Sequence, residues 1–148
     1  MTTTTRLPVD TAFVQLLRDN TTKPVYFPDS GTAESGVPPT DTTPPYVMVT
    51  PIPGGETVGP PLATPEADVE VYYQTDCVGG TASQAVWMAD EVRKIVVGRN
   101  ATGTFDYPLT ITGFDVLTRY TDGGMAGAAL DGKLWVSRPR WCIFVTPA

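Results

Sequence analysis

The clearest periodic pattern in the chain runs from residue 68 to residue 98 and changes its period once. Over residues 68–77, apolar side chains alternate with polar ones, which is the two-residue period of a strand with unlike faces. A glycine pair follows, and Thr81 and Gln84 then have the spacing of a capping box at the start of a helix. The apolar stripe of that helix is Ala82, Ala85, Val86, Ala89, Val92 and Val96. We therefore expect a strand, a short loop and a helix that stops near Gly98.

A second helical pattern lies near the start of the chain. Pro8 suits the first turn of a helix, because its missing N–H is not needed there. The apolar positions that follow have helical spacing, and they are Val9, Phe13, Leu16 and Leu17. We expect a helix over residues 8–18 that packs its apolar face on a sheet, and a brief strand over residues 25–27.

Residues 46–50 form an apolar, β-favouring run between prolines, which predicts a buried strand. The turn-rich residues 51–67 follow, so this strand is expected to pair in antiparallel fashion with residues 68–77. Residues 109–120 predict another strand, with a bulge or bend at its internal glycine, Gly113.

The last predicted strand covers residues 134–146 and contains Pro139. Proline cannot donate a ladder hydrogen bond, so this strand is expected to lie at the rim of the sheet or to be kinked. The remaining segments are expected to be irregular: a frayed tail over residues 1–6, a loop or arm over 28–45, and turns over 121–132. The arm is either disordered or ordered by a neighbouring subunit.

These elements predict an α+β fold in one domain spanning residues 1–148. The sheet is expected to be mostly antiparallel, with about four to five strands and two helices packed on one face. The chain contains 15 prolines and 14 glycines, which predicts long Pro/Gly-rich loops.

The net charge is −6, so an overall basic surface for tight binding to DNA or RNA is absent. The negative charge either keeps the protein soluble or repels DNA that must slide past without sticking. No window approaches the roughly 18 apolar residues of a membrane span, and the first residues lack the apolar stretch of a secretion signal. We expect a protein that stays where it is made.

The chain offers little for catalysis or metal binding. It contains no histidine and only two cysteines, Cys77 and Cys142, so no zinc site is expected. Both cysteines fall in predicted strands and are expected to be buried, reduced thiols, with a disulfide as the alternative. No phosphate-binding glycine motif or paired catalytic carboxylates stand out. We expect no enzyme activity and no cofactor.

Three side chains are candidates for contacts between proteins. Trp87 falls off the apolar stripe of its predicted helix, so we expect it to be exposed and available to a partner. Arg138 and Arg140 share one face of the last predicted strand. They either form a solvated edge that blocks unwanted pairing or dock on acidic residues of a neighbouring subunit.

The order and spacing of motifs over residues 44–99 resemble those of tail terminator proteins from long-tailed (siphovirus-type) phages that infect actinobacteria. The C-terminal residues 145–148 resemble them less closely. The motifs are Pro45-Tyr46-Val47, Pro51, Gly59-Pro60-Pro61-Leu62, Glu66-Ala67-Asp68, Val71-Tyr72-Tyr73-Gln74, Val78-Gly79, Gln84, Trp87-Met88-Ala89-Asp90 and Val92-Arg93.

The resemblance implies an α+β subunit that closes into a ring, typically a hexamer, on the head-proximal end of the tail tube. Such a ring is part of the virion, is assembled in the host cytoplasm, stops tube polymerisation and joins the tail to a neck or connector protein. DNA passes through its lumen without specific binding. The family has no catalytic residues to transfer. Our candidate interface residues are Trp87, Arg138, Arg140, Pro38, Pro39, Asp122 and Met125.

Two alternatives remain open. The chain could be another ring-forming neck protein of the head–tail connector, an adaptor or a stopper. A small enzyme or a free-standing binding module is the alternative of a different class, and a bound metal or a deep pocket with converging polar groups would favour it.

Overall fold

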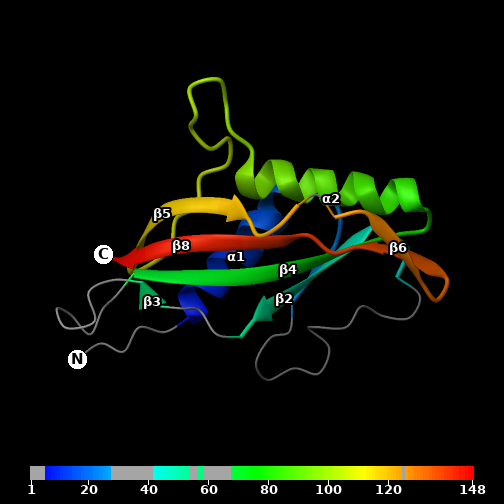
Figure 1. Cartoon of the computed structure of the whole chain (residues 1–148), viewed down its shortest axis with the longest axis horizontal. Coiled ribbons are helices and arrows are strands. Elements are labelled where there is room, and N and C mark those ends of the chain that lie inside the picture. Colours follow the sequence, from blue (N-terminus) through cyan, green and yellow to red (C-terminus); the bar gives the residue numbers. More distant parts are fainter. Residues whose placement is uncertain (1–5, 28–41, 54–56, 59–67, 125) are drawn as a thin grey trace.

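One eight-stranded sheet and two helices make up the computed structural model, which describes residues 6–27, 42–53, 57–58, 68–124 and 126–148 (Figure 1). The helices are α1 (Leu7–Asn20) and α2 (Ala82–Val97). The strands are β1 (Val25–Tyr26), β2 (Tyr46–Ile52), β3 (Thr57–Val58), β4 (Asp68–Gly79), β5 (Phe114–Thr121), β6 (Ala128–Asp131), β7 (Leu134–Ser137) and β8 (Arg140–Pro147). All strand pairs are antiparallel except β1 with β2, so the predicted α+β class is confirmed.

The long strand β4 lies at the centre of the sheet. It pairs with β2 and β3 along one side, and with β7 and β8 along the other. Strand β6 then pairs with β7, and β5 pairs with β8. The sheet has more strands than the four to five predicted for three reasons. It includes the short strand β3, it includes β6 where the sequence predicts turns, and the last predicted strand is divided into β7 and β8.

Both helices cover the same face of the sheet. The alternation predicted for β4 is confirmed: Val71, Tyr73, Thr75 and Cys77 are buried, and the residues between them are half-buried. The buried β4 side chains join residues of α1, α2, β2 and β8 in one apolar core. The ring of Phe13 on α1 stacks on Tyr73 with 4.1 Å between centroids, and Figure 1 shows α1 crossing behind the sheet.

Arg6 and Asp10 fasten the start of α1 to the sheet. The Arg6 guanidinium donates to the backbone carbonyls of Ile52 and Tyr72, at 2.6 and 2.8 Å, and to the Asp10 carboxylate at 2.8 Å. The Tyr73 hydroxyl also donates to Asp10. These bonds hold α1 against β2 and β4 at the point where the helix begins, and they fix its direction across the sheet.

The start of α2 follows the predicted capping pattern. The Thr81 hydroxyl accepts from the Gln84 N–H at 3.1 Å, and the Gln84 side chain accepts from the Gly80 N–H at 2.7 Å. The buried face is rotated from the predicted stripe, because Met88 and Ile95 are buried while Val86 is 37% exposed. Including Val86 in the stripe was therefore wrong.

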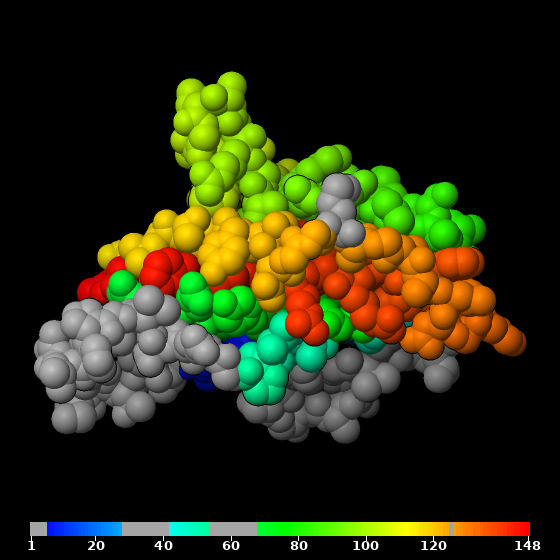
Figure 2. All heavy atoms as spheres, in the orientation of Figure 1, coloured from blue at the N-terminus to red at the C-terminus, as the bar shows by residue number. Residues whose placement is uncertain are grey.

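Residues 98–107 form a loop that projects from the end of α2 (Figures 1 and 2). The Asn100 side chain accepts from the Thr102 and Thr104 N–H groups, at 3.0 and 3.1 Å, and closes the tip of the loop. At its base, the guanidinium groups of Arg99 and Arg119 lie 4.2 and 3.9 Å from the centroid of the Phe105 ring. The loop is therefore stabilised by its own contacts and anchored to β5.

The last third of the chain differs most from the expectations. Strand β5 begins at Phe114 and not at residue 109, because the backbone bends at Gly113, where φ is 84°. The strand predicted over residues 134–146 is broken by Pro139 into β7 and β8, so the predicted kink is confirmed. Strand β8 is not at the rim, since it lies between β4 and β5.

Candidate interaction surface

Trp87 lies on the outer side of α2 and is 45% exposed, so the prediction that it faces away from the core is confirmed. Its neighbour Val86 is also exposed. Both line a shallow, open hollow of about 440 Å³ between α2 and strand β6. The other lining residues are Ala82, Ser83, Asp90 and Ala128. A large aromatic ring beside such a hollow is typical of an interaction surface.

The hairpin β6–β7 extends this hollow. Its two-residue loop starts with Gly132, whose φ of 63° suits the first position of a type II′ turn. Leu130 is two residues from Ala128, so both side chains lie on the α2 side of the strand. Leu130 is 60% exposed. We call Val86, Trp87, Ala128 and Leu130 the Trp87 patch.

Arg138 is occupied within its own chain. Its guanidinium lies 3.0 Å from the Asp131 carboxylate and 3.6 Å from the Asp76 carboxylate. Since Arg138 remains 43% exposed, these pairs contribute little to stability. They do hold the side chain beside the β6–β7 hairpin, so a neighbouring subunit would have to compete for it.

Arg140 and Asp122 lie together at the start of β8. Both residues are exposed, and the Asp122 N–H donates to the Arg140 carbonyl at 2.9 Å. Arg140 also lines a small cavity with Arg93 and Asp90 of α2. Three further candidates, Pro38, Pro39 and Met125, lie outside the described residues.

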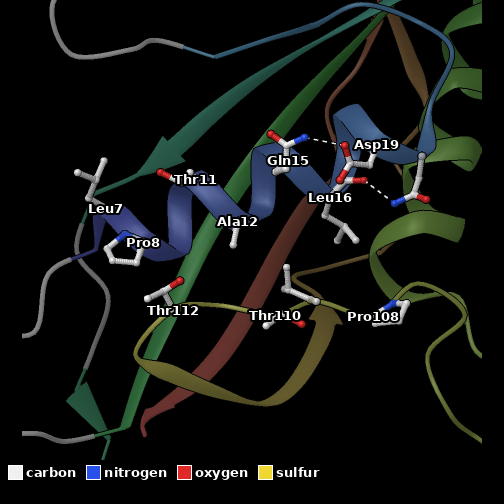
Figure 3. A pocket seen from close by; sticks show the side chains of 12 residues that line it. Leu7, Pro8, Thr11, Ala12, Gln15, Leu16, Asp19, Pro108, Thr110 and Thr112 are labelled. Atoms are coloured by element: carbon white, nitrogen blue, oxygen red, sulfur yellow. Dashed lines mark hydrogen bonds between the residues drawn. The ribbon is translucent and has the colours of Figure 1, made fainter.

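A second concave surface follows α1. The groove has a volume of about 580 Å³ and lies between α1 and residues 108–112 (Figure 3). Its apolar lining includes Ala12, Leu16 and Leu109, whereas Gln15 and Asp19 share a hydrogen bond of 2.6 Å at its polar side. Its lining thus combines apolar side chains with a polar edge, as sites that bind small molecules do.

The face of the sheet opposite the helices carries a cluster of hydroxyls around one carboxylate. Tyr72 and Tyr120 donate to the two oxygens of Glu70, at 2.8 and 3.0 Å. The bond to Glu70 raises the pKa of Tyr72 to about 12. Interaction with Cys142, followed by burial, raises the pKa of Tyr120. Both phenols therefore keep their protons at neutral pH, and each donates a hydrogen bond to Glu70.

The two cysteines are free and buried. Burial raises the pKa of the Cys77 thiol to about 12 and also raises the pKa of Cys142. Nucleophilic chemistry needs the thiolate, so neither group is a ready nucleophile at neutral pH.

The raised pKa of Cys77 predicts sensitivity to alkali. The unfolded thiol loses its proton near pH 9, whereas the folded thiol keeps it to about pH 12, so the free energy of unfolding should fall between these values. Urea unfolding curves at pH 8, 9 and 10 should show this fall, and a Cys77→Ala variant should show a smaller one. An equal pH dependence in both proteins would contradict the assignment.

Among the described residues, no group of three or more His, Cys, Asp or Glu side chains could hold a metal ion. In that same part of the chain, no helix is long and apolar enough to cross a membrane.

Sequence reasoning identified Trp87 but missed Leu130. The helical wheel was sufficient for Trp87, because α2 forms where the pattern predicts it. Leu130 was missed because it lies within residues 121–132, for which the sequence predicts turns but which contain β6. The signal that could have found it is the Asp131-Gly132 turn, which is typical of a hairpin when strands flank it.

Comparison with known proteins does not assign the chain to a family. No family model and no curated protein matches it.

Proposed function

We propose that this chain is a phage tail terminator, a structural protein whose copies form a ring on the head-proximal end of the tail tube. The proposal starts from the motifs of residues 44–99, which resemble those of tail terminators. Those residues include β2, β4 and α2, the central elements of the sheet and its longer helix. The α+β fold agrees with the fold that the resemblance implies.

The observation that best supports a structural role is the exposed Trp87 patch. Its tryptophan and leucine are 45% and 60% exposed, although apolar side chains of this size are commonly buried. Tryptophan is enriched among the residues that dominate binding energy at protein interfaces. Copies in a ring meet through two different patches, so one such surface needs a complementary surface elsewhere on the same chain.

The helix-free face of the sheet suits the wall of a channel for DNA. Its described side chains include the uncharged Gln74 and Tyr72, the carboxylates of Glu70 and Asp76, and the exposed Arg140. These side chains carry charges of both signs, so together they do not create the basic surface that binds DNA phosphates tightly. In the proposed ring, this face would let DNA pass without being held, and the ring would join the tube to a neck protein in the virion.

Tail tube polymerisation tests the proposed function directly. Purified tube protein should stop growing when this protein is added, and negative-stain microscopy should show short tubes with a ring at one end. Tubes of unchanged length would contradict the proposal. Binding to a neck protein but not to the tube would indicate an adaptor or stopper instead.

Trp87→Ala should weaken association between copies while leaving the fold intact. Truncating an aromatic residue at the centre of an interface costs about 2 kcal/mol or more of binding free energy, which is roughly a 30-fold rise in Kd. Sedimentation equilibrium would measure the Kd, and circular dichroism would monitor the fold.

Leu117→Ala is the matched control for Trp87→Ala. Leu117 is 48% exposed, but it lies on β5 outside the Trp87 patch, so this variant should associate like the wild type. Loss of the fold in Trp87→Ala would mean that the Trp87 side chain belongs to the core. Equal weakening in both variants would show that the patch is not special.

A further inference from the structure

In the residues that the structure describes, strand β6 leaves one side of its backbone free. In a two-residue hairpin, the residues next to the turn, Asp131 and Leu134, exchange hydrogen bonds, and the pairing alternates from there. The N–H and C=O groups of Ala128 and Leu130 therefore point away from β7. Within the described part of the chain, β6 pairs with β7 alone. Such an edge can accept another strand.

The free edge lies directly beside the Trp87 patch. Ala128 and Trp87 line the same hollow, and Leu130 follows on the same side of β6. A strand that paired with β6 would place every second side chain on the α2 side, next to Leu130 and towards Trp87. Backbone pairing and apolar burial would thus act together at one place. Figure 2 shows the β6–β7 hairpin, in orange, at one end of the molecule.

The register of the sheet indicates what could pair there. One row of partners crosses five strands through Val25, Val47, Cys77, Ser137 and Ala128. Strands β1 and β6 therefore end the same row, at opposite sides of the sheet. Strand β1 runs opposite to β6, because one parallel pair and three antiparallel pairs separate them. Laid side by side, β1 of one copy and β6 of another would form an antiparallel pair.

The β1 edge can take part in such a pair. The Val47 N–H donates to the Pro24 carbonyl at 3.0 Å, so the backbone groups of Val25 point away from β2. The Val25 carbonyl accepts from Arg18 at 3.2 Å, and its second lone pair can accept another donor. The Val25 side chain is in the helix-side core, the same side as Ala128, so the faces of the two copies would agree.

We infer that β6 of one copy pairs with β1 of the next copy, with Ala128 opposite Val25, so that the sheets continue from subunit to subunit. This inference rests on the proposed ring and specifies its interface. The contact is head-to-tail, which closes into a ring when the rotation between copies permits. In this register Gly127 lies opposite Tyr26, the second residue of β1.

Disulfide trapping tests this register in the full-length chain. Residues opposite each other in antiparallel strands have Cα atoms about 4.5–5.5 Å apart, which is within disulfide reach. Val25 and Ala128 both lie in strands, so mild oxidation of a Val25→Cys/Ala128→Cys double variant should give a ladder of covalent oligomers on a non-reducing gel. The native Cys77 and Cys142 are buried and should contribute little background.

The two single variants are the controls. Neither Val25→Cys nor Ala128→Cys alone should form more than traces of dimer. Strong dimer formation by Ala128→Cys alone would mean that two β6 strands pair with each other, which overturns the inference. No cross-linking in the double variant would overturn it as well.

A second variant tests the role of the backbone. Leu130→Pro removes an N–H that points away from β7, so the hairpin should survive while association falls at least tenfold. Ala129→Ser is the control, because the backbone groups of residue 129 face β7 and the substitution leaves the free edge unchanged. This variant should associate like the wild type. If Leu130→Pro fails to fold, Leu130→Lys provides the test by placing a charge on the edge. Unchanged association of the folded variant would overturn the edge contact.

The outcomes of these experiments distinguish a wrong interface from a wrong function. A ring that caps tail tubes but shows no trapping through β6 would leave the function standing and remove this interface. A trapped head-to-tail oligomer that leaves tube length unchanged would support the interface and count against the terminator function.

Discussion

Gly79→Ala is expected to destabilise the fold by about 3 kcal/mol, at the upper end of the usual cost of overpacking. A Cβ atom at this position would lie 2.4 Å from the Ala85 nitrogen and 2.9 Å from the Gln84 carbonyl carbon. Both atoms belong to the backbone of the first turn of α2, so no side-chain rotation can relieve the clash. The helix would have to move away from β4. Urea unfolding monitored by circular dichroism would measure the loss.

The adjacent glycine is the matched control for that experiment. A Cβ atom at Gly80 would meet the Gln84 side chain at 3.5 Å and the Pro44 ring at 3.7 Å, which are ordinary contacts. Gly80→Ala should therefore change the free energy of unfolding by no more than about 0.5 kcal/mol. Similar losses in both variants would show that the tight contact between β4 and α2 is not the cause.

Trp141→Ala is expected to cost about 3–5 kcal/mol, the usual range for removing a buried tryptophan. The ring of Trp141 is 1% exposed and lies on the helix side of β8. Its indole N–H donates to the Thr75 hydroxyl at 2.9 Å, so the substitution removes the stronger of the two hydrogen bonds that this buried hydroxyl accepts. Thermal unfolding should show a strong fall in Tm or loss of the folded state.

Trp87→Ala provides the comparison within the same chain. The two tryptophans lose the same atoms, but Trp87 is partly exposed on α2, so its removal should cost much less stability. The two variants should thus separate: one loses stability and the other loses association. If the stability ranking were reversed, the assignment of Trp87 to the surface would be wrong.

The unit formed by β4, the glycine pair and α2 was predictable from the sequence, because its local signals agree with its tertiary contacts. The alternation in β4, the Thr81 cap and the glycines before it all indicate the structure that forms. The same agreement made the exposure of Trp87 predictable. The rotation of the buried face of α2 was not predictable, because Val86 and Met88 are both apolar. Only packing against the sheet decides which of the two is buried.

The residues that sequence reasoning missed depend on contacts that form only in the folded chain. Strand β6 is made mainly of small residues with weak β-propensity, and it exists because β7 pairs with it. Arg119 is buried although it carries a charge, because Phe105 stacks on its guanidinium and the Tyr107 carbonyl accepts from it at 2.7 Å. Burial, followed by the nearby charge of Arg99, lowers the pKa of Arg119 to about 10. No local pattern encodes the contacts of Arg119.

In the proposed ring, the loop over residues 98–107 could carry a marker that is visible by microscopy. Because the Asn100 side chain closes its tip without help from the sheet, a short epitope inserted next to Gly103 would extend the tip and leave the core unchanged. Each copy in a particle would then carry one marker at the same radius. Counting bound antibody fragments around the circumference would reveal how many subunits a closed particle contains.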